Sequence, residues 1–352
     1  MPVNAVASDR LLRQLDGYDC IVDARSPSEY ALDRIPGAVN WPTLDDAQRA
    51  AVGTEYQQIS PFDARKRGAA MAARNIAGHV DRELTDKGRD WRPLVYCWRG
   101  GKRSGSLALV LDQIGFKVDV LEGGYQAFRR AMLSALDEAV ARMDCRVLCG
   151  TTGSGKSRLL KVLQSMGEQV LDLEELAEHR GSVLGLVPGA EQPSQKAFDT
   201  RIWDQLRRFE TARPVWIESE SKKVGALRVP EALIVAIRKA PCWRIDLSID
   251  ARVRLLMEDY DFFVADIGAF CERLDALRSL RGNDVVDGWQ AAARKGSVED
   301  VVRELLVAHY DPIYLRSIER NFAGYGEAVV LTPADGSMQS LRRVAASLVT
   351  EG

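Results

Sequence analysis

The sequence predicts an α/β fold made of two successive domains, each built on a parallel sheet. Short apolar strands alternate with helices from about residue 20, and the same alternation restarts near residue 145. The chain of 352 residues is also longer than one hydrophobic core usually supports. Helical patterns dominate beyond residue 250. We therefore expect residues 1–135 to form the first domain and residues 136–352 the second, with helices in its C-terminal part.

Each expected element is an apolar run that ends at turn residues. In the first domain we expect strands at 21–24, 35–40, 94–97 and 118–121, and helices at 60–79 and 106–114. An amphipathic helix at 127–143 follows. In the second domain we expect strands at 146–149, 170–173 and 215–218, and a helix at 157–166.

The bulk composition is that of an ordinary globular protein. With 48 basic and 50 acidic residues the net charge is -2, so any RNA must bind a local basic patch. No apolar run approaches the roughly 20 residues that span a bilayer, and the N-terminal residues lack a signal-peptide pattern, so we expect a cytoplasmic protein that contacts no membrane. Six cysteines in so long a chain do not indicate a disulfide framework.

The strongest motif is a phosphate-binding loop. It matches the pattern G-x-x-x-x-G-K-[ST] and lies between an expected strand and an expected helix. Its glycines let backbone N–H groups surround phosphate oxygens, Lys156 reaches the outer phosphates, and Ser157 is suited to Mg²⁺. The residues are Gly150, Thr151, Thr152, Gly153, Ser154, Gly155, Lys156 and Ser157.

The motif identifies a phosphate site but not the ligand. Nucleotide hydrolases usually add an apolar strand that ends in an acidic residue, which helps to hold Mg²⁺. The nearest counterparts are Asp172 and Glu218, and neither is a clean match. Diphosphate binding is therefore better supported than nucleotide hydrolysis.

A second loop surrounds a cysteine with glycines and cations. Such a loop directs N–H groups and positive charge at one sulfur, which stabilises a thiolate, a persulfide or a bound oxyanion. We expect Cys97 to be the reactive cysteine and the other five to be structural. The candidate residues are Cys97, Arg99, Gly100, Gly101, Arg103 and Ser104, with Lys102 adding charge.

Several segments resemble known families. DARSPSEY, IPGAVNWP, the Cys97 loop and LEGGYQAF resemble a rhodanese domain, with Arg34 where many rhodaneses have histidine. A rhodanese domain followed by a P-loop domain is similar to the tRNA 2-selenouridine synthases. VGTEYQQISPFDARKRGAAMAARNIAGH, LDLEELAEHRGSVLG, WIESESKKVG and HYDPIY resemble that family specifically.

This resemblance implies an activity. Members replace sulfur by selenium on the wobble 2-thiouridine of tRNA, with selenophosphate as donor and an S-geranyl intermediate made from geranyl diphosphate. It implies tRNA as the macromolecular partner and selenophosphate synthetase as a candidate partner that supplies the donor. No organic cofactor is expected, and Mg²⁺ at Ser157 is the one candidate metal.

Other residues are weaker candidates, each as compatible with a structural role. For substrate or Mg²⁺ these are His179, Arg180, Gly181, Ser182, Glu218, Glu220, Ser221 and Lys222, and for base stacking Tyr310, Asp311 and Tyr314. Residues 260–264 are a candidate geranyl pocket. A subset of the following is expected to contact tRNA phosphates: Lys222, Lys223, Arg228, Arg252, Arg254, Arg273, Arg278, Arg281, Arg294, Lys295, Arg316 and Arg320.

Two alternatives remain open. One is a P-loop kinase or NTPase with a regulatory rhodanese module, which predicts nucleotide turnover and a dispensable Cys97. The other is a sulfur-relay module that carries a persulfide on Cys97 and has no affinity for tRNA. The family-specific segments outside the two loops disfavour both.

Overall fold

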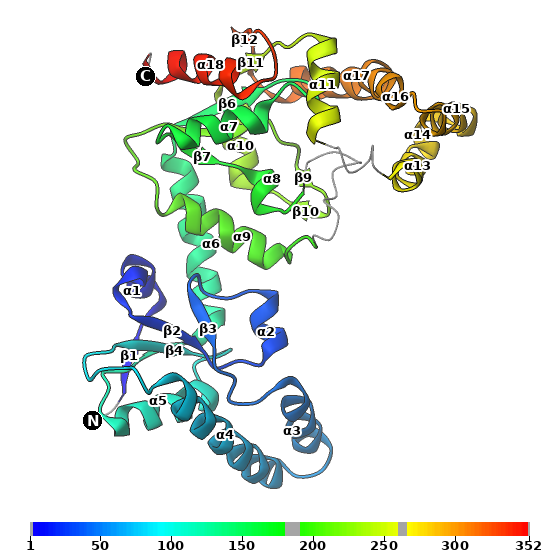
Figure 1. The fold of residues 1–352 in the computed structure, drawn as a ribbon. Helices are drawn as coiled ribbons and strands as arrows, with labels where there is room; N and C mark the ends of the chain where they lie inside the picture. The colour runs from blue at the N-terminus through cyan, green and yellow to red at the C-terminus, as the bar shows by residue number, and fades with distance from the viewer. Residues whose placement is uncertain (1–2, 180–190, 260–265, 351–352) are drawn as a thin grey trace. The chain divides into compact units, whose positions relative to one another are not determined.

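A computed structural model describes residues 3–179, 191–259 and 266–350. Its residue contacts divide the chain into two compact units. The first comprises Met1–Glu138 together with Pro193–Asp204, and the second comprises Ala139–Gln192 and Gln205–Gly352. Both are α/β units with parallel sheets, as the sequence predicts (Figure 1).

The sheet of the first unit has the strand order β1-β5-β4-β2-β3 within the described residues, and all its neighbouring strands are parallel. Side chains on these strands are mostly buried because helices cover them. The strands are β1 (Asn4–Val6), β2 (Cys20–Asp23), β3 (Ala38–Asn40), β4 (Pro93–Tyr96) and β5 (Asp119–Leu121).

The helices of the first unit pack around a core that joins the sheet to α5. Val22 and Val95 of the sheet meet Leu107 and Leu111 of that helix. The described helices are α1 (Ser8–Arg13), η1 (Leu15–Gly17), α2 (Pro27–Leu32), α3 (Asp46–Gln58), α4 (Pro61–Glu83), α5 (Lys102–Ile114), α6 (Gly124–Arg142) and α9 (Gln195–Leu206).

The main sheet of the second unit has the order β12-β11-β6-β8-β7 within the described residues and is also parallel. The central strand β6 leads into the phosphate-binding loop. The strands are β6 (Cys145–Cys149), β7 (Gln169–Leu171), β8 (Val215–Glu218), β11 (Pro241–Ile245) and β12 (Gly324–Leu331), with a separate antiparallel pair β9 (Lys223–Val224) and β10 (Leu227–Arg228).

Most helices of the second unit follow its strands. These are α7 (Lys156–Ser165), α8 (Leu173–Leu176), α10 (Glu231–Lys239), α11 (Ile249–Asp259), α17 (Asp311–Asn321) and α18 (Met338–Thr350). Leu159 and Leu163 of α7 pack with Leu148 of β6 and Leu341 of α18 in the core of this unit. Apolar burial on both sides of β6 therefore fixes the strand from which the loop emerges.

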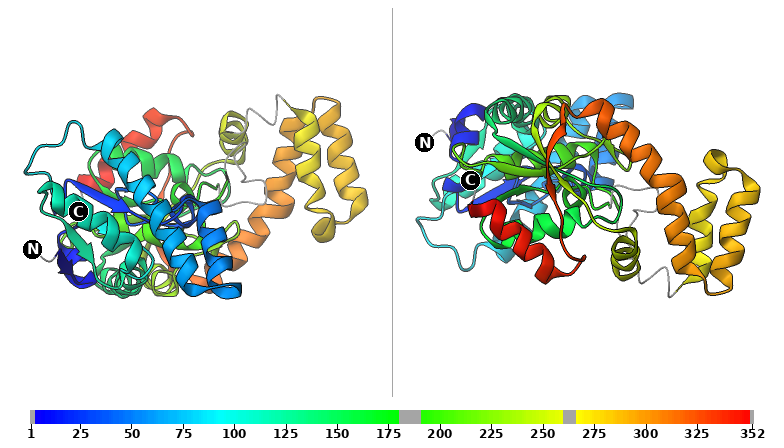
Figure 2. Two further views of the ribbon diagram at one scale, coloured as in Figure 1. Left: turned by 90° about the horizontal axis from the view of Figure 1, so that it is seen from below. Right: turned by 90° about the horizontal axis from the view of Figure 1, so that it is seen from above.

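A helical cluster follows residue 266, in agreement with the expected helical C-terminal part. It has a hydrophobic core of its own, which includes Phe270, Leu274 and Trp289. Figure 2 shows these helices gathered to one side of the sheet of the same unit. They are α13 (Ile267–Asp275), α14 (Arg278–Arg281), α15 (Asn283–Arg294), α16 (Val298–Glu304) and the π-helical η2 (Leu305–Tyr310).

Several expected boundaries were wrong. The helix expected at 60–79 extends to Glu83, and the strand expected at 35–40 begins at Ala38. Three further differences lie near the two loops. Helix α5 begins at Lys102 rather than 106, and α6 begins at Gly124 rather than 127, because glycines with unusual backbone angles allow both helices to start early. The strand expected at 170–173 ends at Leu171. Asp172 accepts a hydrogen bond from the Glu175 N–H at 2.9 Å, which starts α8 there instead.

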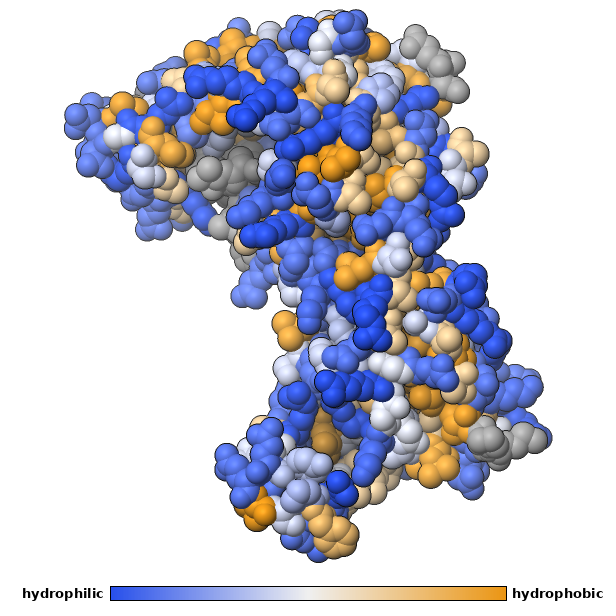
Figure 3. All heavy atoms as spheres, turned by 180° about the vertical axis from the view of Figure 1, so that it is seen from behind, coloured by the Kyte–Doolittle hydropathy of each residue, from blue (hydrophilic) through white to orange (hydrophobic). Residues whose placement is uncertain are grey.

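No helix in the described part of the chain is long and apolar enough to cross a bilayer. The face drawn in Figure 3 is largely hydrophilic, with hydrophobic side chains in several smaller groups.

Candidate functional site

Cys97 lies in a tight loop between β4 and α5. Its side chain is 3% exposed, and its sulfur accepts hydrogen bonds from the Gly101 N–H at 3.3 Å and the Ser104 hydroxyl at 3.1 Å. Gly100 has a φ of +66°, and a Cβ there would come within 2.7 Å of the Leu121 carbonyl oxygen. The loop thus requires glycine and points two donors at one sulfur, which suits a thiolate or a bound anion.

A buried ion pair fixes the base of this site. The Arg25 guanidinium contacts Asp23 at 2.6 Å and also donates to the Asp33 carbonyl at 2.6 Å. The Tyr96 hydroxyl donates to the same Asp23 carboxylate at 2.7 Å. The DARSPSEY segment therefore ties β2 to β4, directly before Cys97.

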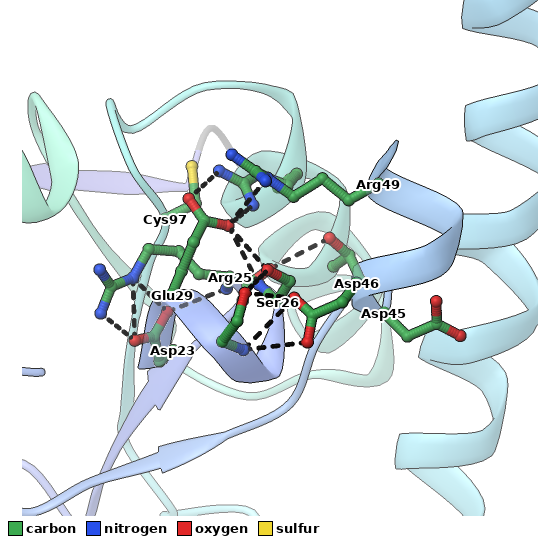
Figure 4. A network of polar contacts seen from close by, with 12 residues as sticks. Asp23, Arg25, Ser26, Glu29, Asp45, Asp46, Arg49 and Cys97 are labelled. Carbon is green, nitrogen blue, oxygen red and sulfur yellow. Dashed lines mark hydrogen bonds and ion pairs between the residues drawn. The ribbon is translucent and has the colours of Figure 1, made fainter. Parts of the chain in front are cut away.

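The cation predicted at Arg103 is engaged by a carboxylate. Its guanidinium donates to Glu29 at 2.5 Å. The Arg49 guanidinium lies 3.2 Å from the same oxygen, and Figure 4 shows Arg49 and Glu29 together. Burial raises the pKa of Glu29, but the hydrogen bond and charge of Arg103 outweigh burial and hold the pKa below its usual range. An incoming anion would therefore compete with Glu29 for Arg103. Arg99 donates to the Gln126 side chain at 3.1 Å.

The phosphate-binding loop, Gly150–Ser157, emerges from β6 and enters α7. Gly153 has a φ of +75°, which disfavours any side chain there. The Lys156 ammonium donates to the Gly150 carbonyl at 2.7 Å, so it lies over its own loop. Among the described residues the buried Ser154 hydroxyl has no hydrogen-bond partner.

The start of α17 holds this loop at two points. The Gly150 N–H donates to the Tyr314 hydroxyl at 2.9 Å. Arg252 donates to the Thr152 carbonyl at 2.7 and 2.9 Å and pairs with Asp311 at 2.6 Å. Asp311 and Tyr314 are three residues apart, so they share one face of the helix. The HYDPIY segment thus braces the loop.

Three carboxylates gather beside Ser157. The Ser157 hydroxyl donates to Glu174 at 3.3 Å, and one oxygen from each of Glu174, Glu218 and Glu220 lies within 4.8 Å of the others. Burial, followed by the charge of Glu220, raises the pKa of Glu174 to about 8. Burial also raises the pKa of Glu220 to about 7, against the lowering effect of Lys156, and raises that of Glu218 well above its usual range.

Comparison with known proteins identifies the family. The model of the rhodanese-like domain matches residues 7–131, and that of the tRNA 2-selenouridine synthase AAA domain matches residues 143–275. A tRNA 2-selenouridine synthase from Pseudomonas syringae pv. syringae is 31% identical, with 86% of this chain and 89% of the relative covered. The chain belongs to the tRNA 2-selenouridine synthase family. Synthases from Alcanivorax borkumensis (30% identical; 84% and 88% covered) and Nitrosomonas europaea (29%; 88% and 93%) agree.

The weaker candidate site residues do not all lie beside the two loops. His179 is buried, and burial lowers its pKa. Ser221 is exposed, and its hydroxyl donates to the Lys223 carbonyl at 2.5 Å, whereas its backbone N–H donates to the Glu220 carboxyl group at 3.2 Å. Arg180, Gly181, Ser182 and residues 260–264 lie outside the described residues.

Some of the predicted RNA contacts already have protein partners. Arg252 is 6% exposed and serves the phosphate-binding loop. Arg278 pairs with Asp275 at 2.8 Å and Asp287 at 2.7 Å. Lys222 is ion-paired with Glu231 at 3.5 Å. The guanidinium groups of Arg252 and Arg278 are therefore weaker candidates for tRNA phosphates than the exposed Lys223 and Lys295.

Sequence reasoning missed Glu174 as a site residue. The two predicted acidic counterparts were Asp172 and Glu218. Glu218 lies in the cluster, whereas Asp172 caps α8 and Glu174 reaches Ser157 instead. The acidic repeat in LDLEEL was the available signal, but the end of a strand that short is not readable from sequence. The bracing role of Arg252 was also missed, because it depends on contacts between segments far apart in the chain.

Proposed function

We propose that this chain converts wobble 2-thiouridine of tRNA to 2-selenouridine, with selenophosphate as the selenium donor and S-geranyl-2-thiouridine as the intermediate. The membership in the tRNA 2-selenouridine synthase family supports the overall conversion. The presence of two separate anion-binding loops in one chain carries the two-step form of the proposal. The names of the relatives specify neither donor.

The first step is alkylation of the thiouridine sulfur. The sulfur bonds to C1 of the geranyl group, the carbon–oxygen bond to diphosphate breaks, and the uridine N3 proton is released. The leaving diphosphate carries negative charge that loop N–H groups and Lys156 are suited to hold. Mg²⁺ at Ser157 would supply further charge neutralisation.

The second step exchanges the geranylthio group for selenium. Selenium bonds to C2 of the base, the carbon–sulfur bond breaks, and geranylthiol leaves with a proton. Water then cleaves the phosphorus–selenium bond, which releases phosphate, and N3 regains a proton. A thioether leaves as a neutral thiol, so prior alkylation makes this displacement easier than direct loss of sulfide. Selenophosphate is an oxyanion that the donors around Cys97 and the Arg103 guanidinium suit. Selenophosphate synthetase is the proposed supplier.

The decisive test of the first step is incubation of thiolated tRNA with the protein and geranyl diphosphate alone. We expect S-geranyl-2-thiouridine by nucleoside mass spectrometry, together with one released diphosphate per modified base. Parallel reactions with ATP or GTP address the rival activity. If the protein hydrolyses ATP or GTP without needing tRNA, and the thiouridine stays unmodified, the kinase or NTPase hypothesis would be favoured.

A further inference from the structure

The carboxylates beside Ser157 come from separate segments that fold onto one point. Glu174 lies on α8, Glu218 ends β8, and Glu220 follows two residues later. Strand β8 is the parallel neighbour of β6, so its end meets the phosphate-binding loop. The fold therefore brings three carboxyl groups together beside Ser157, whose hydroxyl donates to Glu174.

The burial of these groups requires compensation. Glu218 is 1% exposed and Glu220 is 9% exposed, and buried carboxylates are costly unless they are paired or coordinate a metal. Within the described residues Glu218 Oε1 is buried and has no hydrogen-bond partner. The nearby Lys156 ammonium donates to the Gly150 carbonyl. Besides this lysine, the Ser157 hydroxyl donates to Glu174 and the Ser221 N–H donates to Glu220. Glu218 Oε1 is the oxygen that stays without a partner among the described residues.

We propose that Glu174, Glu218 and Glu220, with the Ser157 hydroxyl, bind one divalent cation of the Mg²⁺ class. Carboxylate and hydroxyl oxygens are the donors that Mg²⁺ and Mn²⁺ prefer. Two oxygens on opposite sides of one Mg²⁺ are about 4.2 Å apart, from bonds of about 2.1 Å. The ligand oxygens here lie within 4.8 Å of one another, so small side-chain rotations suffice.

The identity of the phosphate ligand rests on the proposed function, whereas the metal site follows from the positions of the carboxyl groups alone. P-loop hydrolases usually hold the ion with one hydroxyl, one carboxylate and the phosphates of the substrate. Three carboxyl groups offer more protein ligands than that, so in this proposal the ion, on displacing their protons, is held before any phosphate arrives. The cation then lies beside the loop and attracts the diphosphate group of an incoming ligand.

The test measures metal binding directly, without tRNA or an organic substrate. Mn²⁺ is titrated into the full-length protein, and free Mn²⁺ is followed by electron paramagnetic resonance, with and without inorganic diphosphate. The variants are E174Q, E218Q and E220Q, each nearly isosteric. E175Q is the matched control, because Glu175 is the neighbouring residue on α8, carries the same charge and is exposed.

The wild-type protein and E175Q should bind one Mn²⁺ without diphosphate, and diphosphate should tighten binding. E174Q and E218Q should weaken Mn²⁺ binding by at least about tenfold, since even outer-shell changes cost 10–100-fold. E220Q provides a second reading if E218Q does not fold, which circular dichroism decides.

Two results would overturn the site: no Mn²⁺ binding by the wild-type protein, or equal binding by wild type and all three variants that fold. Geranylation that persists in chelator, together with absent Mn²⁺ binding, would defeat this inference and leave the proposed function intact. Normal Mn²⁺ binding with unmodified thiouridine would defeat the proposed function and leave the metal site intact.

Discussion

At the scale of single residues, the Cys97 loop and the phosphate-binding loop present different chemical groups. Cys97 places a sulfur beside the Gly101 N–H and the Ser104 hydroxyl. Lys156 places an ammonium group over a loop of backbone donors. If the two loops serve different half-reactions, single substitutions should remove one activity and spare the other.

Substitution of Cys97 by serine should stop selenation and leave geranylation intact. Serine keeps the size of the side chain but is a far weaker nucleophile and anion partner at neutral pH. The measurement is conversion of thiolated tRNA with each donor, with Cys20→Ser as the control. Loss of both activities in a folded C97S protein would mean that Cys97 is structural.

Substitution of Lys156 by alanine should lower geranylation by a factor of about 100 or more, since loss of one charge-stabilising donor typically costs 10²–10³ in rate. Selenation of tRNA that is already geranylated should persist. Lys161→Ala is the control, because Lys161 is an exposed lysine on the same helix. Unchanged geranylation by K156A would remove the phosphate-binding loop from the first step.

The Glu29 carboxylate should make stability depend on pH. Its pKa is lowered on folding, so its contribution is complete above the unfolded value of about 4.3 and is lost as pH falls through the folded value. Glu29→Gln should cost about 1.5–3 kcal/mol at pH 7. Urea unfolding should show that the difference in free energy of unfolding between wild type and Glu29→Gln is smaller at pH 4 than at pH 7. Asp86→Asn, which breaks an exposed ion pair, should change the free energy of unfolding little at either pH. A constant difference would contradict the ion-pair assignment.

At the scale of elements, α17 acts as a brace for the phosphate-binding loop. Asp311 orients Arg252, which holds the Thr152 carbonyl, and Tyr314 receives the Gly150 N–H. This arrangement gives the HYDPIY segment a physical role that base stacking does not require. A brace of this kind preorganises the loop before the ligand binds.

Loss of the Tyr314 hydroxyl should weaken binding of inorganic diphosphate without unfolding the protein. The hydroxyl also forms a hydrogen bond with Ser219 Oγ at 2.8 Å, but only its bond to the Gly150 N–H reaches the loop. One hydrogen bond has a net value of about 1 kcal/mol, so Tyr314→Phe should raise Kd about fivefold. Calorimetric titration measures this, with Ser317→Ala on the same helix as the control. Equal affinity in Y314F and wild type would show that the hydroxyl does not set the loop.

Much of the fold was predictable at this scale, because its signals are local. Apolar runs and turn residues located β2, β4, β6 and β8 within one or two residues. The starts of α5 and α6 were not, since they depend on the fit of Gly100 and Gly124 against neighbouring backbone. The strands β11 and β12 were also missed, because the charged residues within them obscure their pattern.

At the scale of the whole molecule, the order of segments along the chain does not decide which unit a segment packs in. Residues 193–204 follow the phosphate-binding loop in sequence yet pack in the first unit. There the Arg129 guanidinium donates to the Lys196 carbonyl at 2.8 Å, and the Thr200 hydroxyl donates to Asp33 at 3.0 Å. No local pattern marks such a return. The carboxylate cluster was unpredictable for the same reason, because three short segments must meet before it exists.

The most direct test of the two-step reaction combines both donors and omits each in turn. Thiolated tRNA is incubated with the protein, geranyl diphosphate and selenophosphate, and its nucleosides are analysed by mass spectrometry. We expect 2-selenouridine with both donors and accumulation of S-geranyl-2-thiouridine without selenophosphate. We expect unchanged 2-thiouridine without geranyl diphosphate. Formation of 2-selenouridine in the absence of geranyl diphosphate, or unchanged thiouridine with both donors, would contradict the proposed sequence of steps.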